Sequence, residues 1–135
     1  MEITVNFEFV NWWAVLAATV VVFILGGFWY SPALFGRIGG VVTEQSGVGR
    51  NMQAVFVVAY FFQWLAASFL AAVLGPNSTA TYGLMIGLMV GLFFVTTALG
   101  ITNIFDNKPL KHLLVNGGYH TVSFGIMGLI IGFWH

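Results

Sequence analysis

Polar side chains recur along one side of an apolar segment near the carboxyl end of the chain. One face of a helix there would carry His112, Asn116, Tyr119, His120 and Ser123, because their spacings of three, four and eight residues match helical turns. Histidine is the only side chain whose unperturbed titration falls near neutral pH, so a buried His120 could relay protons or gate a water-filled path. The alternative is a neutral, hydrogen-bonded histidine that only holds helices together.

Further polar residues lie in two other apolar segments, at a depth similar to that of His120. Tyr60 and Gln63 form the polar edge of one segment, and Thr96 and Thr97 are adjacent in another. Counted from the ends nearest the Lys and Arg residues, His120, Tyr60 and the threonine pair lie about seven residues deep, roughly 10 Å at 1.5 Å per residue. We therefore predict one polar cluster as the candidate site, made up of Tyr60, Gln63, Thr96, Thr97, Asn116, Tyr119, His120 and Ser123.

The common catalytic motifs are absent from the sequence. It contains no nucleophile elbow, no zinc-protease spacing, no phosphate-binding loop and no paired carboxylates. The absence of cysteine removes thiolate metal sites, iron–sulfur clusters and a cysteine nucleophile. All three histidines lie between His112 and His135, an arrangement that offers no obvious metal site within one subunit. The sequence therefore predicts no enzyme, no metal and no cofactor, with a haem held by His120 from two subunits as a remote alternative.

The composition indicates which solvent surrounds these polar groups. Of 135 residues, 59% are hydrophobic and 6% are charged, whereas soluble domains carry roughly 25% charged residues. Four Lys and Arg residues and four Asp and Glu residues are too few to cover a soluble surface. Lipid must therefore be the outer solvent. Because the formal net charge is zero and no basic cluster exceeds two residues, nucleic-acid binding is set aside.

Four segments are long and apolar enough to cross a membrane, for which a helix needs about 20 mostly apolar residues. They cover residues 9–30, 53–74, 81–101 and 113–134. The link GPNSTAT between the second and third segments is so short that those helices must be antiparallel neighbours. Acidic residues at the amino end argue against a signal peptide, so we expect the first segment to be retained. We predict an all-α integral membrane protein of one domain, with four transmembrane helices in an antiparallel bundle.

All four basic residues lie in the two links on one side of this predicted bundle. Arg37 and Arg50 belong to the first link, and Lys108 and Lys111 to the third. The positive-inside rule makes that side cytoplasmic, so both termini are predicted to lie on the outer side. These four cations are also candidates for contact with an anionic headgroup or another anion. The alternative for the third link is an ordinary turn whose lysines only follow the positive-inside rule.

Glycines recur at helical spacing in the third and fourth segments. A stripe without side chains lets another backbone approach closely, which is how many membrane helices pack. The two stripes indicate a tight internal bundle or self-association, and we expect both. The predicted packing residues are Gly83, Gly87 and Gly91, which are four apart, and Gly118, Gly125 and Gly132, which are seven apart.

Three stretches of the chain resemble a known family. They are NWWAVL at 11–16, GGFWYSPALFG at 26–36 and NKPLKHLLVNGGYH at 107–120. In order and spacing they are similar to the bacterial domain-of-unknown-function family 1761, and the resemblance covers nearly the whole chain. It implies a four-span inner-membrane protein without an assigned activity, and it supplies no catalytic or binding residues.

Two functions from different classes follow from these features. The first is a small homo-oligomeric protein of the bacterial inner membrane that lines a pathway for an ion or small solute, with the polar cluster around His120 inside. The second is a structural or accessory subunit that docks against other membrane proteins through its glycine-rich helix faces. The lipid bilayer is the expected partner in both; a second copy of the chain is expected in the first, and other membrane proteins in the second.

Overall fold

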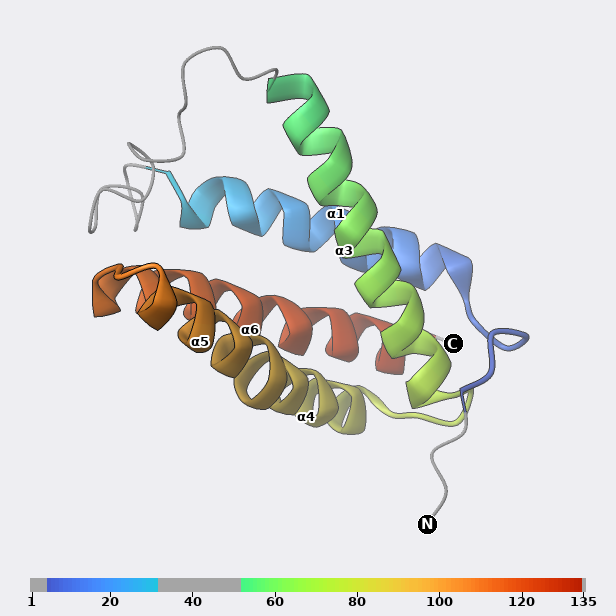
Figure 1. Cartoon of the computed structure of the whole chain (residues 1–135). Coiled ribbons are helices and arrows are strands. Elements are labelled where there is room, and N and C mark those ends of the chain that lie inside the picture. The colour runs from blue at the N-terminus through green and yellow to red at the C-terminus, as the bar shows by residue number, and fades with distance from the viewer. Residues whose placement is uncertain (1–4, 32–51, 135) are drawn as a thin grey trace.

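The computed structural model describes residues 5–31 and 52–134, and these parts are helical apart from short turns and the amino-terminal residues (Figure 1). Three consecutive elements, α4, η2 and α5, follow one another without a break and form one long helix, in which η2 has π-helical hydrogen bonding. In chain order the elements are α1 Trp12–Trp29, α3 Met52–Leu74, α4 Ala80–Val90, η2 Gly91–Thr96, α5 Thr97–Phe105 and α6 Leu110–Phe133.

The prediction of four long apolar helices is confirmed. The third span extends to Phe105 instead of ending near residue 101, and the fourth begins at Leu110 instead of 113. Polar residues near the end of a helix do not by themselves stop it, so composition places such boundaries poorly. The helices long and apolar enough to cross a membrane cover Trp12–Trp29, Gln53–Leu74, Ala80–Phe105 and Leu110–Phe133.

The link between α3 and α4 is a short turn with specific residues at both helix ends. Gly75 follows the last residue of α3 with φ of +78°, a left-handed conformation that glycine adopts without steric cost. Thr79 precedes α4, and its side-chain oxygen accepts a hydrogen bond from the backbone N–H of Tyr82 at 3.1 Å. This bond satisfies one of the free N–H groups at the start of the helix.

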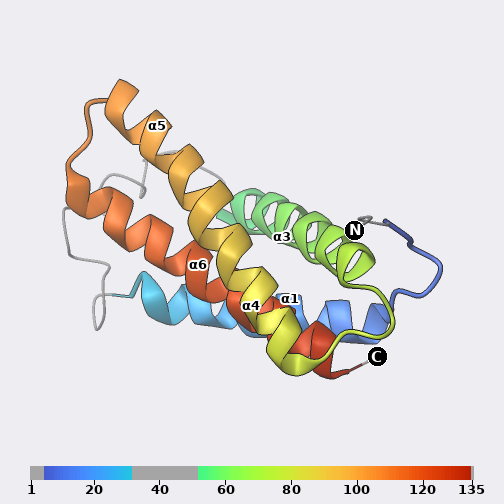
Figure 2. The same cartoon turned by 90° about the horizontal axis from the view of Figure 1, so that it is seen from below.

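The helix α6 lies at the centre of the fold and contacts α1, α3, α4, η2 and α5. Within its most apolar window 44% of the residues are buried, compared with 11% for the span Ala80–Phe105. Along the contact between α4 and α6, Gly83 meets Gly128 while Gly91 meets Thr121. Residue numbers rise along one helix as they fall along the other, so these two helices run in opposite directions (Figure 2).

A hydrophobic core joins α1, α3 and α6 at one end of the molecule. It takes in the first part of α1 and the last parts of α3 and α6. At the other end α3 diverges, so that its first turns stand apart from η2 and α5 (Figure 1). The core residues are Ala14, Val15, Ala18, Val22, Ala67, Leu70, Ala71, Leu74, Met127 and Ile131.

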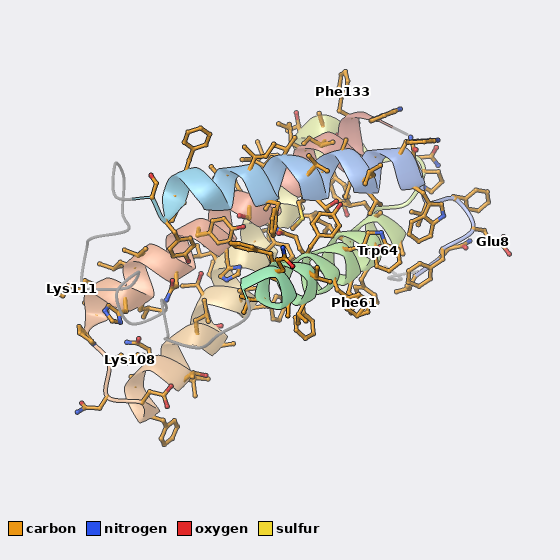
Figure 3. The ribbon with its side chains drawn as sticks, turned by 90° about the horizontal axis from the view of Figure 1, so that it is seen from above. Glu8, Phe61, Trp64, Lys108, Lys111 and Phe133 are labelled. Carbon is orange, nitrogen blue, oxygen red and sulfur yellow. The ribbon has the colours of Figure 1, made fainter. Side chains whose placement is uncertain are left out.

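Charged side chains of the described residues lie at the two ends of the molecule and not along its sides. Lys108 and Lys111 lie at one end and Glu8 at the other (Figure 3). The sides expose large apolar groups, among them Phe94 at 71% and Ile104 at 78% of their surface. Contiguous apolar surface of this extent, on helices of this length, suggests contact with a lipid bilayer.

A cleft with unpartnered polar groups

A cleft of about 1190 Å³ lies between α1, α3 and α6, with Val95 of η2 at its edge. It occupies the region where α3 diverges from the other helices, and it adjoins the hydrophobic core, with which it shares Met127. Its wall is mainly apolar, and no Asp, Glu, Lys or Arg of the described residues lines it. The aromatic part of the wall comprises Phe23, Tyr30, Phe56, Phe62, Tyr119 and Phe124.

Four side chains of the predicted cluster line this cleft, and three of them have no hydrogen-bond partner among the described residues, namely Gln63 from α3 and His120 and Ser123 from α6. Ser123 is 1% exposed, and its hydroxyl has no hydrogen-bond partner among the described residues. Within the same part of the chain, neither the Gln63 amide nor the His120 imidazole forms a hydrogen bond. Buried polar groups are nearly always bonded, so the unbonded hydroxyl of Ser123 points to water or a ligand in the cleft, where the partly buried Gln63 and His120 side chains could also bind it.

Tyr119 also lines the cleft, but its hydroxyl is used within the fold. It donates a hydrogen bond to the backbone oxygen of Val22 at 3.2 Å. The Tyr119 ring lies 5.1 Å from the His120 ring and 5.4 Å from the Tyr30 ring, both in edge-on geometry. A Cβ on Gly26 would lie 2.9 Å from the Tyr119 hydroxyl, so a glycine in α1 makes room for this side chain. Tyr119 therefore fixes α1 against α6 and orients the ring of its neighbour.

Asn116 lies outside the cleft and joins α6 to the end of α1. Tyr30 donates its hydroxyl proton to Asn116 Oδ1 at 2.6 Å. One residue earlier, the indole N–H of Trp29 donates to the backbone oxygen of Val115 at 2.9 Å. Trp29 and Tyr30 were not among the predicted site residues, yet both hold two helices together. The sequence does contain a signal for this role, because the indole N–H and the phenol O–H of adjacent Trp and Tyr residues usually find a hydrogen-bond partner when they are buried.

The predicted threonine pair is divided between two environments. Thr96 reaches α6: its hydroxyl lies 3.1 Å from the backbone oxygen of Gly117, 3.1 Å from Thr121 Oγ1 and 2.8 Å from the backbone oxygen of Gly91. Thr97 is exposed and bonds only to backbone oxygens of its own helix, at Phe93 and Phe94. Neither threonine lines the cleft.

Tyr60 also bonds away from the other predicted members. Its hydroxyl lies 2.8 Å from Thr19 Oγ1, which is fully buried in α1 and also bonds to the backbone oxygen of Val15. The Tyr60 ring packs edge-on against Phe23 at 5.6 Å. Thr19 is a site contact that sequence reasoning missed, because a single threonine within an apolar run carries no periodic signal. The eight predicted residues thus lie in five local environments, of which the cleft holds Gln63, Tyr119, His120 and Ser123.

Most of the predicted packing glycines lie in the contact between α4 and α6. A Cβ on Gly83 would overlap the backbone oxygen of Gly128, and one on Gly87 would overlap that of Phe124. A Cβ on Gly91 would lie 2.6 Å from the Cα of Thr121. On α6, Gly125 and Gly132 face α4, where their neighbours include Leu88 and Thr79. Gly118 differs, since it faces α1 and a Cβ there would lie 3.1 Å from the Trp29 ring.

The third link is a tight turn. Asn107 has φ of 54°, a conformation that asparagine tolerates better than most residues. Asn103 closes the turn by donating from Nδ2 to the backbone oxygens of Lys108 and Pro109 at 3.1 and 3.3 Å. Lys108 and Lys111 are exposed, while Arg37 and Arg50 lie outside the described residues. Within the described ranges, no group of three His, Cys, Asp or Glu side chains is placed to hold a metal ion.

The fold and the cleft define a class of protein. It is all-helical, with four helices long and apolar enough to span a membrane, and it has a mainly apolar cleft lined by a few polar side chains among three of them. The chain belongs to the family described as proteins of unknown function, DUF1761, whose match covers residues 13–132. This confirms the resemblance seen in the sequence. No curated protein matches the chain, and no solved structure matches it either.

Proposed function

We propose that this protein crosses the bacterial inner membrane four times, as an antiparallel bundle with both termini outside, and binds a small uncharged molecule in the cleft. The placement rests on exposed apolar sides, on charges at the helix ends and on the four basic residues in two links. In this orientation the cleft lies in the cytoplasmic half of the bilayer, because its walls include the last turns of α1 and the first half of α3.

A single observation carries the binding function, namely that Gln63, His120 and Ser123 line one cleft without hydrogen-bond partners among the described residues. A polar group left unbonded in apolar surroundings costs free energy, which a ligand or water in the cleft would offset. An uncharged ligand fits better than an ion, because the described lining contains no charged side chain to offset the free energy needed to desolvate an ion.

The cleft could serve as one binding site along a solute pathway, but it does not form a complete pore. At its inner end, Met127 lines the cleft, and with Val15 and Val22, each less than 2% exposed, it fills the space between α1, α3 and α6. A solute that crosses the membrane therefore needs this core to open, or a second copy of the chain to complete the route. We propose a homo-oligomer in which each chain contributes one such cleft.

The alternative is an accessory subunit that docks through its glycine faces, but these faces are not accessible to a partner. Gly83 and Gly87 are covered by α6 within the same chain, at backbone contact distance. Any partner would have to bind the exposed aromatic surface instead, for example that of α3 around Phe61. We therefore place binding in the cleft ahead of docking.

Cysteine accessibility tests whether the cleft is open in a membrane, since the natural chain contains no cysteine. Three alanines provide a matched set: Ala66 lines the cleft, its neighbour Ala67 is 0% exposed in the core, and Ala98 is exposed on the outer face of α5. Each is replaced by cysteine, and the protein in lipid nanodiscs is treated with N-ethylmaleimide. Thiolates, and not thiols, react with this reagent.

We expect rapid modification of Ala66→Cys and slow modification of Ala67→Cys and Ala98→Cys, because only the cleft combines space with enough water to ionise a thiol. Mass spectrometry gives the three rates. If Ala66→Cys reacts no faster than Ala67→Cys, the cleft is closed and the proposed binding function is wrong. If Ala98→Cys reacts as fast as Ala66→Cys, the outer face is not in lipid and the membrane placement fails.

A further inference from the structure

We infer that the ligand of the cleft is a lipid-soluble ring compound with carbonyl oxygens, the chemistry of a quinone, and that it reaches the cleft from the bilayer. This inference rests on the proposed function and specifies its ligand. It concerns binding alone and includes no electron transfer. Shape, hydrogen-bond chemistry and the direction in which the cleft opens support it separately.

The shape of the cleft favours a flat ring. Six aromatic side chains contribute to its wall, and the Tyr119 ring already stands edge-on to the Tyr30 ring at 5.4 Å and to the His120 ring at 5.1 Å. Aromatic rings prefer edge-on or offset neighbours, so a flat ring from a ligand continues this arrangement. The volume of about 1190 Å³ exceeds the roughly 300–1,000 Å³ usual for small-molecule sites. A ring and the first part of an attached chain therefore fit together.

The polar groups favour a ligand that accepts hydrogen bonds at two separated positions. Gln63 projects from α3 while His120 and Ser123 project from α6, so the groups lie on different walls of the cleft. A glutamine amide offers two N–H donors, and a neutral histidine and a serine offer one donor each. Two carbonyl oxygens on one ring accept from both walls. Such a ligand would also hold the diverging part of α3 to α6.

The opening of the cleft favours access from lipid. Phe56 and Phe62 of α3 line the cleft and are also 52% and 65% exposed, so they mark its rim. Val95 of η2 also lines the cleft. The first turns of α3 diverge from the other helices (Figure 1), and the charged residues Glu8, Lys108 and Lys111 lie at the two ends of the molecule and not on this side (Figure 3). In the proposed membrane placement this side faces acyl chains, which dissolve uncharged ring compounds and exclude ions.

The experiment measures how ligands protect the thiol of Ala66→Cys from N-ethylmaleimide in nanodiscs. Duroquinone is the probe, because its fully methylated ring has two carbonyl oxygens and no free position for a thiol to add. Durene is the matched control, since it is the same ring and methyl groups without the oxygens. Palmitate represents a charged amphiphile. At a duroquinone concentration near ten times its Kd we expect about tenfold slower modification, by mass action.

Durene and palmitate are expected to leave the rate within about twofold. Equal protection by durene would overturn the inference, because the cleft would then only fill with apolar matter. Protection by palmitate without protection by duroquinone would also overturn it. Rapid modification of Ala66→Cys that no compound slows would reject the ligand class and leave an open cleft, whereas slow modification without ligand would reject the proposed function itself.

Two second-site variants test the hydrogen bonds. In the Ala66→Cys background, Gln63→Leu and His120→Phe each remove donors, and each should raise the Kd for duroquinone about fivefold or more, as expected for a lost hydrogen bond. Thr97→Val is the control, because Thr97 is exposed and bonds only within its own helix. Gln63→Leu keeps the test valid if the bulk of phenylalanine disturbs folding. Unchanged Kd in Gln63→Leu would overturn the role of the amide.

Discussion

The hydroxyl of Tyr30 donates a 2.6 Å hydrogen bond to Asn116 Oδ1 and thereby joins the end of α1 to α6 across 86 residues of sequence. Beside it, the Trp29 indole donates to the backbone oxygen of Val115 at 2.9 Å. These two bonds hold the wall of the cleft at the end where α3 diverges. The stability of this wall is therefore expected to depend on a few polar contacts.

Removal of the Tyr30 hydroxyl should destabilise the fold without changing its shape. Tyr30→Phe leaves the Asn116 side chain without its donor, and we expect the free energy of unfolding to fall by about 0.6–1.7 kcal/mol, between the average and the largest values found for hydrogen bonds between membrane helices. Unfolding in mixed detergent micelles measures the change. Tyr82→Phe, at an exposed tyrosine, is the control and should have no effect. Equal values for the two variants would show that the bond contributes nothing.

A side chain at Gly83 should be tolerated far less well than one at Gly27. A Cβ on Gly83 would overlap the backbone oxygen of Gly128, so Gly83→Ala forces α4 and α6 apart, and we expect a loss of about 1–3 kcal/mol or more. A Cβ on Gly27 meets no atom within 4 Å, so Gly27→Ala should be neutral or stabilising by up to about 1 kcal/mol through helix propensity.

The same unfolding measurement compares the two glycine variants. The packing assignment is contradicted if Gly83→Ala is as stable as the natural chain. Gly27→Ala also checks the method, because a large loss there would mean that any added methyl group in these helices is harmful.

Neighbouring threonines should differ when each is replaced by valine, which has the same shape without the hydroxyl. Thr96→Val loses the contacts that join η2 to Gly117 and Thr121 on α6, and we expect a cost of about 0.6–1.7 kcal/mol. Thr97→Val loses only bonds within its own helix and should stay within about 0.5 kcal/mol of the natural chain. Reversal of this order would place the helix contact at the wrong threonine.

Labelling of single cysteines should place the second and third links on opposite sides of the membrane. Asn77 and Asp106 are exposed in those links, and neither is a basic residue that sets orientation. In intact spheroplasts an impermeant maleimide is expected to label Asn77→Cys, and to label Asp106→Cys only after the membrane is opened. The opposite pattern would reverse the proposed orientation, and labelling of both before opening would exclude the four-span topology.

The glycine pattern shows which helix contacts could be predicted from the sequence and which could not. A repeat of four residues predicts that Gly83, Gly87 and Gly91 share a face, and the structure places all three against α6. The repeat did not predict the π-helical turn that follows. A regular helix would bring Val95 to the next contact position, whereas the extra residue in η2 brings Thr96 to Gly117. Such a local change in helical pitch arises from contacts with another helix, so no pattern within one segment reports it.

The candidate site was predicted only in part, for a similar reason. Depth and helical face are properties of one segment, and they correctly grouped His120 with Ser123 on the cleft side of α6. Which polar group meets which partner depends on the angle between helices. Tyr60 contacts Thr19 of α1 and not His120 of α6. The reason is that α3 crosses α1, while its first turns lie away from α6 (Figure 1). The prediction of one polar cluster at a common depth assumed that the helices run alongside one another for their whole length, whereas α3 diverges from α6.

The sequence by itself determined the number of long apolar helices, and its composition is the ground for proposing lipid as their solvent. Low charge and four apolar runs leave few other solutions, because burial of apolar surface is set by composition and length. Only the tertiary structure decided that α6 is central, that α3 diverges, and that Gln63, His120 and Ser123 share a cleft without bonding to described residues. These outcomes depend on close packing between segments distant in sequence, where the position of a single methyl group determines which helices can touch.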